Sequence, residues 1–192
     1  MARRPRHDYP GSSYHVTSRG NNRGRVQYDD VDCGIWQRTL ARVVLRYSWE
    51  VLAYCLLTNH FHLVVRAPTG GLSDGMCLLN GGYARQLNGR HRRLDHVFGR
   101  RFWSKPIETR TYLLGSLHYV AWNPVRAGLA ETPEAYRWSS HGAVIGIREA
   151  PSFLAADAVL EVFDADPTRA RAVYSSYVSN PRVPVPGTVT EV

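Results

Sequence analysis

Two apolar runs, WEVLAYCLLT at 49–58 and HFHLVVRA at 60–67, constrain the fold more than any other part of the sequence. Both runs are short and rich in β-branched and aromatic residues, which is typical of β-strands. The turn at Thr58-Asn59 separates them, so they predict an antiparallel hairpin. Side chains alternate across a strand, so Phe61 and Leu63 share one face of the second strand and can pack on helices.

Further strands and helices are predicted on both sides of this hairpin. Strand-like segments lie at 12–20 and 96–108, and the segments 29–48, 72–93 and 109–128 are predicted to be helices. The predicted order is therefore β-α-β-β-α-β-α, which is the split β-α-β pattern of ferredoxin-like folds. We expect an α+β fold in which helices pack on an antiparallel sheet.

Several residues are candidates for ending or capping these helices. Ser73 or Asp74 is the expected N-cap of the second helix, and Thr109 is that of the third. Within the third helix, Asn123-Pro124 is expected to bend or stop the chain, and Gly128 is expected to close it.

The rest of the chain predicts an extension to this unit. It contains the loop YRWSSHGAVIG and one more helix near 154–178. We therefore divide the chain into a main domain at 1–128 with a basic N-terminal arm, a C-terminal extension at 129–180 packed on it, and a flexible tail at 181–192.

The charge distribution indicates a partner rich in phosphate. The formal net charge is +8, and the basic residues concentrate in the first two thirds of the chain, whereas acidic residues outnumber basic ones after residue 150. A merely solvated basic surface is the alternative. The cysteines Cys33, Cys55 and Cys77 are widely spaced and are expected to be reduced core residues. There is no apolar run of membrane-spanning length and no secretion signal, so we expect a cytoplasmic protein without a membrane partner.

His60 and His62 lie two positions apart in the second run of the hairpin, so their imidazoles face the same side of the sheet. Two histidines hydrogen-bonded within a core would explain this spacing. The alternative is a shared metal or phosphate, because two imidazoles held together must be satisfied. A metal site would need a further ligand from elsewhere in the chain.

Tyr119 and Asn123 are four residues apart on the predicted third helix and so share one helical face. An asparagine oxygen can bind a hard cation, and a tyrosine can attack a phosphate whose charge a metal offsets. From the residues alone, however, packing by Tyr119 and a capping role for Asn123 explain the pair better.

Several blocks of the sequence resemble a known family. NHFHLVV is similar to the HUH motif (His-hydrophobic-His) of single-tyrosine transposases, and YVAWNPVRAGL at 119–129 is similar to a block of their REP-associated branch. YHVTSRGNNR, LNGGYARQLNGRH, HVFGRRF and YRWSSHGAVIG fit the same branch in the same order. The resemblance covers about residues 12–178.

This resemblance implies a function and a set of roles. His60, His62 and Asn123 would bind one divalent ion, Mg²⁺ or Mn²⁺, and Tyr119 would attack single-stranded DNA near a palindromic hairpin. The enzyme would remain joined to the DNA through a 5′-phosphotyrosine and release a 3′-OH. No nucleotide cofactor is expected, and the branch favours a monomer, although dimers occur in the family.

Basic residues are the candidate DNA contacts. They supply phosphate affinity, while neighbouring aromatic residues can stack on unpaired bases. One of Phe102 and Trp103 is expected to be core, because the two alternate across a strand, and His118 is expected to be a surface or phosphate contact. The candidate DNA contacts are Arg3, Arg4, Arg6, Arg19, Arg23, Arg25, Arg100, Arg101 and Lys105.

Two other functions stay open at this point. The chain could be a domesticated protein that binds hairpin DNA without cutting it. It could also be a metal-dependent phosphoester hydrolase that uses water in place of tyrosine.

Overall fold

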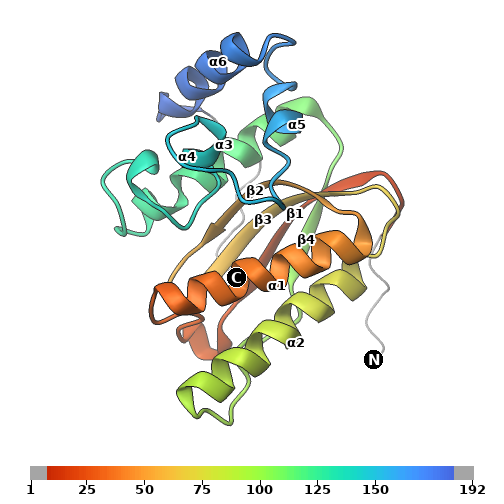
Figure 1. Cartoon of the computed structure of the whole chain (residues 1–192), viewed down its shortest axis with the longest axis vertical. Coiled ribbons are helices and arrows are strands. Elements are labelled where there is room, and N and C mark those ends of the chain that lie inside the picture. The colour runs from red at the N-terminus through yellow and green to blue at the C-terminus, as the bar shows by residue number, and fades with distance from the viewer. Residues whose placement is uncertain (1–7, 184–192) are drawn as a thin grey trace.

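The structure is a computed structural model that describes residues 8–183. The predicted N-terminal arm with Arg3, Arg4 and Arg6 lies outside the described residues, as does most of the predicted tail. Figure 1 shows a sheet with two long helices on one side and the C-terminal elements on the other. Among the described residues, no helix is both long enough and apolar enough to cross a bilayer.

Four antiparallel strands form the sheet, in the spatial order β2-β3-β1-β4, which confirms the predicted ferredoxin-like arrangement. The predicted fourth strand at 96–108 is shorter than expected. Its first part forms a loop, since only Phe98 makes an isolated bridge, with Gly20, just beyond the end of the neighbouring strand. The strands are β1 (Ser12–Arg19), β2 (Glu50–Leu56), β3 (His60–Ala67) and β4 (Trp103–Ile107).

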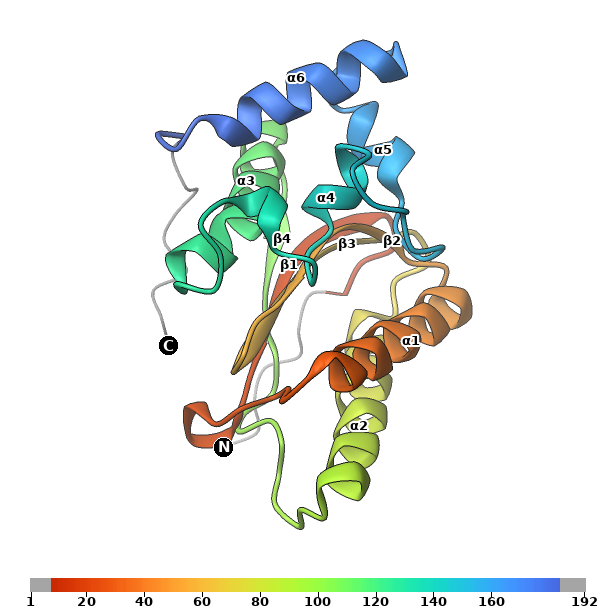
Figure 2. The same ribbon diagram turned by 60° about the vertical axis from the view of Figure 1, so that its left-hand side comes forward.

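The helices α1 (Asp30–Tyr47) and α2 (Leu72–His91) cover one face of the sheet, as Figures 1 and 2 show. The predicted N-caps of α2 are both wrong, because the N-cap position is Gly71 and its side chain cannot cap. The carboxylate of Asp8 takes over this role by accepting hydrogen bonds from the first two backbone N–H groups of the helix, at 3.0 and 3.1 Å.

The third helix, α3 (Arg110–Arg126), lies over the opposite face of the sheet (Figure 2). Its predicted N-cap is confirmed, since the Thr109 hydroxyl accepts a hydrogen bond from the Tyr112 N–H. The helix does not stop at Asn123-Pro124, because it continues for two residues beyond the proline, and the alternative of a bend there stays a prediction. Gly128 then follows the helix with a φ of +67°, a value that favours glycine.

The C-terminal extension contains more short elements than predicted. It includes the 3-10 turn η2 (Pro133–Ala135) and three helices, α4 (His141–Val144), α5 (Ala156–Leu160) and α6 (Pro167–Ser179). The single helix expected near 154–178 is therefore wrong. Asp166 starts a new helix there, because its side chain accepts from the Arg169 N–H and a proline follows at the first helical position.

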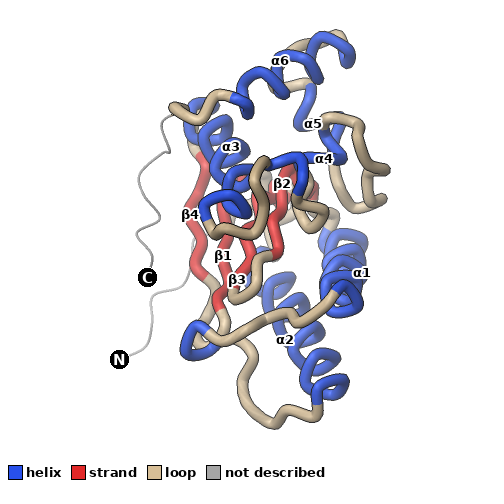
Figure 3. The backbone as a smooth tube through the Cα atoms, turned by 90° about the vertical axis from the view of Figure 1, so that its left-hand side faces the viewer, coloured by secondary structure: helices blue, strands red, loops and turns tan. Residues whose placement is uncertain are grey.

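The extension joins the sheet through backbone hydrogen bonds to β2. The Leu56 N–H donates to the Trp138 carbonyl at 2.9 Å, and the Ser140 N–H donates to the Tyr54 carbonyl at 2.9 Å. Ala155 N–H also donates to the carbonyl of Val51 at 2.9 Å. Figure 3 shows this segment beside β2.

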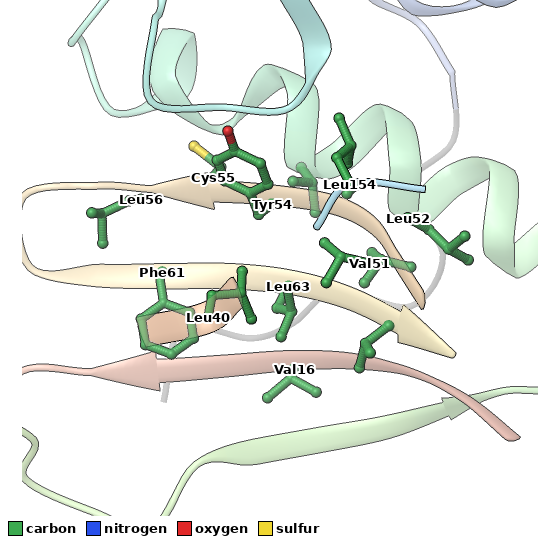
Figure 4. Packing of buried hydrophobic residues seen from close by; sticks show 14 of the residues in the cluster. Val16, Leu40, Val51, Leu52, Tyr54, Cys55, Leu56, Phe61, Leu63 and Leu154 are labelled. Atoms are coloured by element: carbon green, nitrogen blue, oxygen red, sulfur yellow. The ribbon is translucent and has the colours of Figure 1, made fainter. Parts of the chain in front are cut away.

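Apolar side chains fill the space between the sheet and the helices. Phe61 and Leu63 face the side covered by α1, as predicted, and Figure 4 shows them beside Leu40 and Val16. Of the three cysteines, Cys33 and Cys55 are buried and free, as expected, whereas Cys77 is free but exposed on α2.

Candidate active site

His60 and His62 lie on the face of β3 beneath α3, opposite the face that packs on α1 and α2. Their ring centroids are 5.0 Å apart. His62 is buried, with 2% of its surface exposed, and His60 is half-buried near the start of the strand. On the neighbouring strand β1, Thr17 is paired with His62 and Arg19 is paired with His60, so all four side chains share this face.

His15, on β1, is a third histidine at this site, and the sequence reasoning missed it. Its Nε2 lies 3.1 Å from Nδ1 of His62, and the Thr17 hydroxyl lies 3.0 Å from the same nitrogen. The sequence carries a signal for this histidine, because His15, Thr17 and Arg19 are two positions apart along YHVTSRG and so share one face of the strand. The pairing register of β1 with β3, which brings His15 to His62, is not readable from either segment alone.

The hydrogen bond of His60 selects its tautomer, and the contacts of His62 are compatible with the same one. Nδ1 of His60 lies 2.7 Å from the amide oxygen of Asn59, which can only accept, so Nδ1 carries the proton and donates it. Nε2 of His60 is then left with a lone pair. For His62, Nδ1 can donate to His15 or to Thr17, while its buried Nε2 has no hydrogen-bond partner among the described residues.

Burial keeps these imidazoles neutral. Desolvation is the largest cause that lowers the pKa of His60 to about 4, and the nearby Arg19 charge lowers it further. Desolvation also lowers the pKa of His15 to about 4, with a contribution from Lys105, and holds the pKa of His62 well below its usual range. For His60 and His62, a neutral imidazole with a free Nε2 lone pair is the form that binds a metal.

Helix α3 brings Tyr119 to the same histidines. The Tyr119 ring centroid lies 5.2 Å from that of His62 and 5.7 Å from that of His15, in edge-to-face arrangements. The guanidinium of Arg126, two helical turns further on, lies 5.1 Å from the Tyr119 ring centroid. Arg126 was also missed, although its spacing of seven residues from Tyr119 places both on one helical face.

Asn123 is buried one turn after Tyr119 on α3. Its amide nitrogen donates to the backbone carbonyl of Tyr119 at 2.9 Å, so the amide oxygen is the atom left for a cation. His118, by contrast, is neither a surface residue nor a phosphate contact. It is fully buried, because α6 covers this side of α3 and the Asn180 carbonyl lies 2.8 Å from His118 Nε2.

The residues present fit a divalent ion with mixed nitrogen and oxygen ligands. The fit rests on the buried, unpartnered Nε2 of His62 and on the tautomer of His60. Within residues 8–183, His, Cys, Asp and Glu side chains alone form no group of three that could hold a metal, so a third ligand taken from these residues would be of another type. An amide oxygen such as that of Asn123 meets this requirement.

Among the described residues, the predicted DNA contacts lie on β1 and β4 or in the segments next to these strands. Arg19 is next to His60, and Lys105 on β4 is exposed, with its ammonium 4.6 Å from the ring centroid of Tyr112. The exposed arginines Arg23 and Arg25 follow β1, and Arg100 and Arg101 precede β4. Their role in DNA binding stays a prediction.

Phe102 and Trp103 separate as expected. Phe102 is buried in the core, whereas Trp103 is half-buried and its ring centroid lies 5.8 Å from that of His15. Trp103 is therefore the aromatic residue of this pair that belongs to the candidate site.

Comparisons with known proteins agree with this arrangement. A family model described as "Transposase IS200 like" matches residues 9–118, ending directly before Tyr119. A protein of Haemophilus influenzae named as a REP-associated tyrosine transposase is 29% identical over 105 residues, which cover 49% of this chain and 60% of that relative. The chain thus spans less than two thirds of the length of this relative.

A similar fold occurs in a solved structure. The structure of a REP-associated tyrosine transposase bound to a REP hairpin superposes with a TM-score of 0.66 and 18% sequence identity. The match covers 81% of this chain and 92% of the other. At this identity the likeness concerns the fold, a four-stranded antiparallel sheet with helices.

Proposed function

The chain belongs to the IS200-like transposase family, and we propose that it cuts and rejoins single-stranded DNA near palindromic hairpins through a covalent 5′-phosphotyrosine. One observation carries the proposal. The Tyr119 ring packs against His62, whose Nε2 is buried and has no hydrogen-bond partner within the described part of the chain. A phenol beside a site suited to a cation is the arrangement that tyrosine attack on a phosphate requires.

The reaction exchanges one phosphodiester for another. The Tyr119 oxygen forms a bond to phosphorus, the bond from phosphorus to the 3′ oxygen breaks, and the proton lost by the phenol is balanced by protonation of the leaving 3′ oxygen. The DNA 5′ end stays on the enzyme, and a free 3′-OH can later attack the phosphotyrosine to rejoin a strand. No nucleotide cofactor is needed, because the number of phosphoester bonds is unchanged.

Residues of the chain supply the positioning. Thr17 and His15 hold the His62 ring through Nδ1, and Asn59 holds the His60 ring, so both Nε2 atoms have fixed directions. A Mg²⁺ or Mn²⁺ ion bound by His60, His62 and Asn123 would supply positive charge to offset that on the phosphate oxygens.

Arg126 adds positive charge near the nucleophile, and Arg19 adds positive charge near His60. The Arg126 guanidinium lies against the Tyr119 ring, and Arg19 lies beside His60 on the adjacent strand. Charges in these positions favour the approach of a phosphodiester to the phenol.

The experiment is to incubate the protein with a single-stranded hairpin oligonucleotide and Mn²⁺, then to denature the mixture and look for a DNA–protein adduct. We expect an adduct that is absent in Tyr119→Phe, with Tyr112→Phe, on the same helix, as the matched control that retains it. Binding without an adduct would instead support a non-cutting hairpin-binding protein. Cleavage without an adduct would support a hydrolase that uses water.

The supporting facts also favour hairpin DNA as the partner. The solved relative of the same fold is bound to a REP hairpin, and this chain has a net charge of +8 with exposed arginines in the segments that follow β1 and precede β4. We propose that hairpin DNA binds this surface and that the protein acts as a monomer.

A further inference from the structure

The side chain of Asn59 joins the candidate metal site to a neighbouring turn. This turn is η1 (Asn21–Arg23), a short 3-10 segment that follows β1. The Asn59 amide nitrogen donates to the Arg23 carbonyl at 3.3 Å, and the amide oxygen lies 2.7 Å from Nδ1 of His60. Within residues 8–183, the Asn59 side chain makes no other hydrogen bond. Asn59 therefore links the backbone of the turn directly to a candidate metal ligand.

The turn has an unusual backbone conformation. Asn22 and Arg23 have φ angles of +49° and +58°, in the left-handed region that residues other than glycine seldom adopt. The Arg23 N–H donates to the Gly20 carbonyl at 3.1 Å, and the Gly24 N–H donates to the Asn21 carbonyl at 2.7 Å. Backbone of this kind persists only where surrounding contacts hold it, and it is frequent at functional sites. The direction of the Arg23 carbonyl depends on this conformation.

Backbone hydrogen bonds hold the turn beside the connection between β2 and β3. The Gly20 N–H donates to the Asn59 carbonyl at 2.8 Å, and the Val26 N–H donates to the Thr58 carbonyl at 2.8 Å. These two bonds flank the turn and fix the backbone of Asn59 next to it. The Asn59 side chain can therefore reach the Arg23 carbonyl and the His60 ring at the same time.

The Arg23 carbonyl selects the orientation of the Asn59 amide. The two ends of an amide group have nearly the same shape, but one end only donates hydrogen bonds and the other only accepts them. A backbone carbonyl can only accept, so the amide NH₂ must face Arg23 and the amide oxygen must face His60. In the reversed orientation the NH₂ would donate to Nδ1 of His60, and the ring proton would then lie on Nε2, where it blocks a metal.

We propose that Asn59 is a positioning residue through which turn η1 controls the tautomer of His60 and hence the affinity for a divalent ion. The inference rests on the metal site of the proposed function. In the left-handed turn, the Arg23 carbonyl holds the amide so that Nε2 of His60 keeps its lone pair. When the turn leaves this conformation, the amide is free to reverse, and the metal-binding tautomer is no longer favoured.

Two substitutions at Asn22 separate the turn conformation from the side chain. Asn22 is exposed, and its side chain makes no hydrogen bond within the described part of the chain. Asn22→Val disfavours the left-handed backbone, because a β-branched residue is strained at positive φ. Asn22→Gly is the matched control, since it removes the same side chain but adopts positive φ readily.

Asn59→Asp uncouples His60 from the turn. Both oxygens of a carboxylate accept hydrogen bonds, so the Nδ1 proton of His60 finds an acceptor in either orientation of the side chain. The tautomer of His60 should then no longer depend on the Arg23 carbonyl. Asn22→Val is therefore made both in the parent protein and in the Asn59→Asp background.

Two measurements follow the tautomer and the metal separately. The ¹⁵N chemical shifts of the His60 ring in the metal-free protein identify the nitrogen that carries the proton, and calorimetric titration gives the Mn²⁺ affinity. We expect Asn22→Val to populate the tautomer with the proton on Nε2 and to weaken Mn²⁺ binding about tenfold. Asn22→Gly should resemble the parent in both measurements. In the Asn59→Asp background, Asn22→Val should leave the proton on Nδ1 and weaken Mn²⁺ binding less than about twofold.

Three results would overturn the inference. These are an unchanged His60 tautomer in Asn22→Val, an equal effect of Asn22→Gly, and an equal loss of Mn²⁺ affinity in the Asn59→Asp background. The proposed cutting activity is judged separately by the covalent adduct of Tyr119. An adduct in a protein whose His60 tautomer ignores the turn would reject this inference alone. A tautomer that follows the turn in a protein that forms no adduct would reject the cutting activity alone.

Discussion

Two side chains lie within hydrogen-bond distance of His62 Nδ1, and removing them one at a time and together tests how the metal site is held in place. Either Thr17 or His15 can accept the Nδ1 proton, at 3.0 and 3.1 Å. Thr17→Val removes the hydroxyl at nearly constant volume, and His15→Phe removes both ring nitrogens while keeping an aromatic ring against Trp103 and Tyr119. Each single change leaves His62 with one partner.

The double variant should behave very differently from either single one. With both partners gone, the buried Nδ1–H is unsatisfied at a cost of about 1–3 kcal/mol. No partner then fixes the proton on Nδ1, so the tautomer with the proton on Nε2, which lacks the lone pair that a metal needs, becomes populated as well. Loss of the hydrogen-bond partner of a metal-binding histidine lowers metal affinity about 10–100-fold. We therefore expect the Mn²⁺ affinity of the double variant to fall by about 10–100-fold, and that of each single variant to fall by less than about threefold.

The measurement is calorimetric titration with Mn²⁺ in the absence of DNA. Thr111→Val, at an exposed position of α3, is the matched control for a lost hydroxyl and should bind the ion normally. If the double variant bound Mn²⁺ as tightly as the parent, or if the two single losses simply added, the redundant-partner explanation would be wrong.

Four other perturbations have clear expected outcomes. His60→Ala should abolish DNA cleavage but spare hairpin binding in a gel-shift assay, and equal loss of both would refute its assignment to the metal. Deleting residues 1–6 removes three arginines, so hairpin binding should weaken and its dependence on salt should flatten; an unchanged slope would argue against contact with DNA. Trp122→Phe removes the indole N–H that donates to the buried Val178 carbonyl at 2.7 Å, so the free energy of unfolding should fall by about 1–3 kcal/mol, measured by urea titration. Burial lowers the pKa of His141, so its stabilising contribution is complete above pH ~6.5 and is lost as the pH falls towards the lower folded-state pKa; His141→Gln should reduce the pH dependence of unfolding between pH 7 and 5.

The strand and helix order was predictable because each element carries its own periodic signal. The alternation around His60 and His62 was enough to place both imidazoles on one face of their strand. The spacing of four residues was enough to place Tyr119 and Asn123 on one face of their helix. Features that depend on distant parts of the chain were not readable. The capping of α2 by Asp8, the burial of His118 under α6 and the approach of His15 to His62 all arise from tertiary contacts.

In the candidate site, too, some residues could be predicted from the sequence and others depend on tertiary contacts. The residue types for the metal and the nucleophile were visible in the sequence, and the resemblance to a family supplied their roles. The residues that orient them were not visible, since Thr17, Asn59 and Arg126 are ordinary surface-type residues until the fold brings them to the histidines and to Tyr119. The tautomer of His60 and the fixed ring orientation of His62 therefore follow from the structure.

The attachment of the C-terminal segment to β2 also limits how copies of this chain can associate. Residues 138–140 and Ala155 already use hydrogen-bonding groups along the outer side of β2. At the opposite border of the sheet, β4 is only five residues long and contains Pro106, which has no N–H to offer. Two molecules therefore cannot readily merge their sheets into one continuous ladder, and any pairing between them would have to use helices or loops.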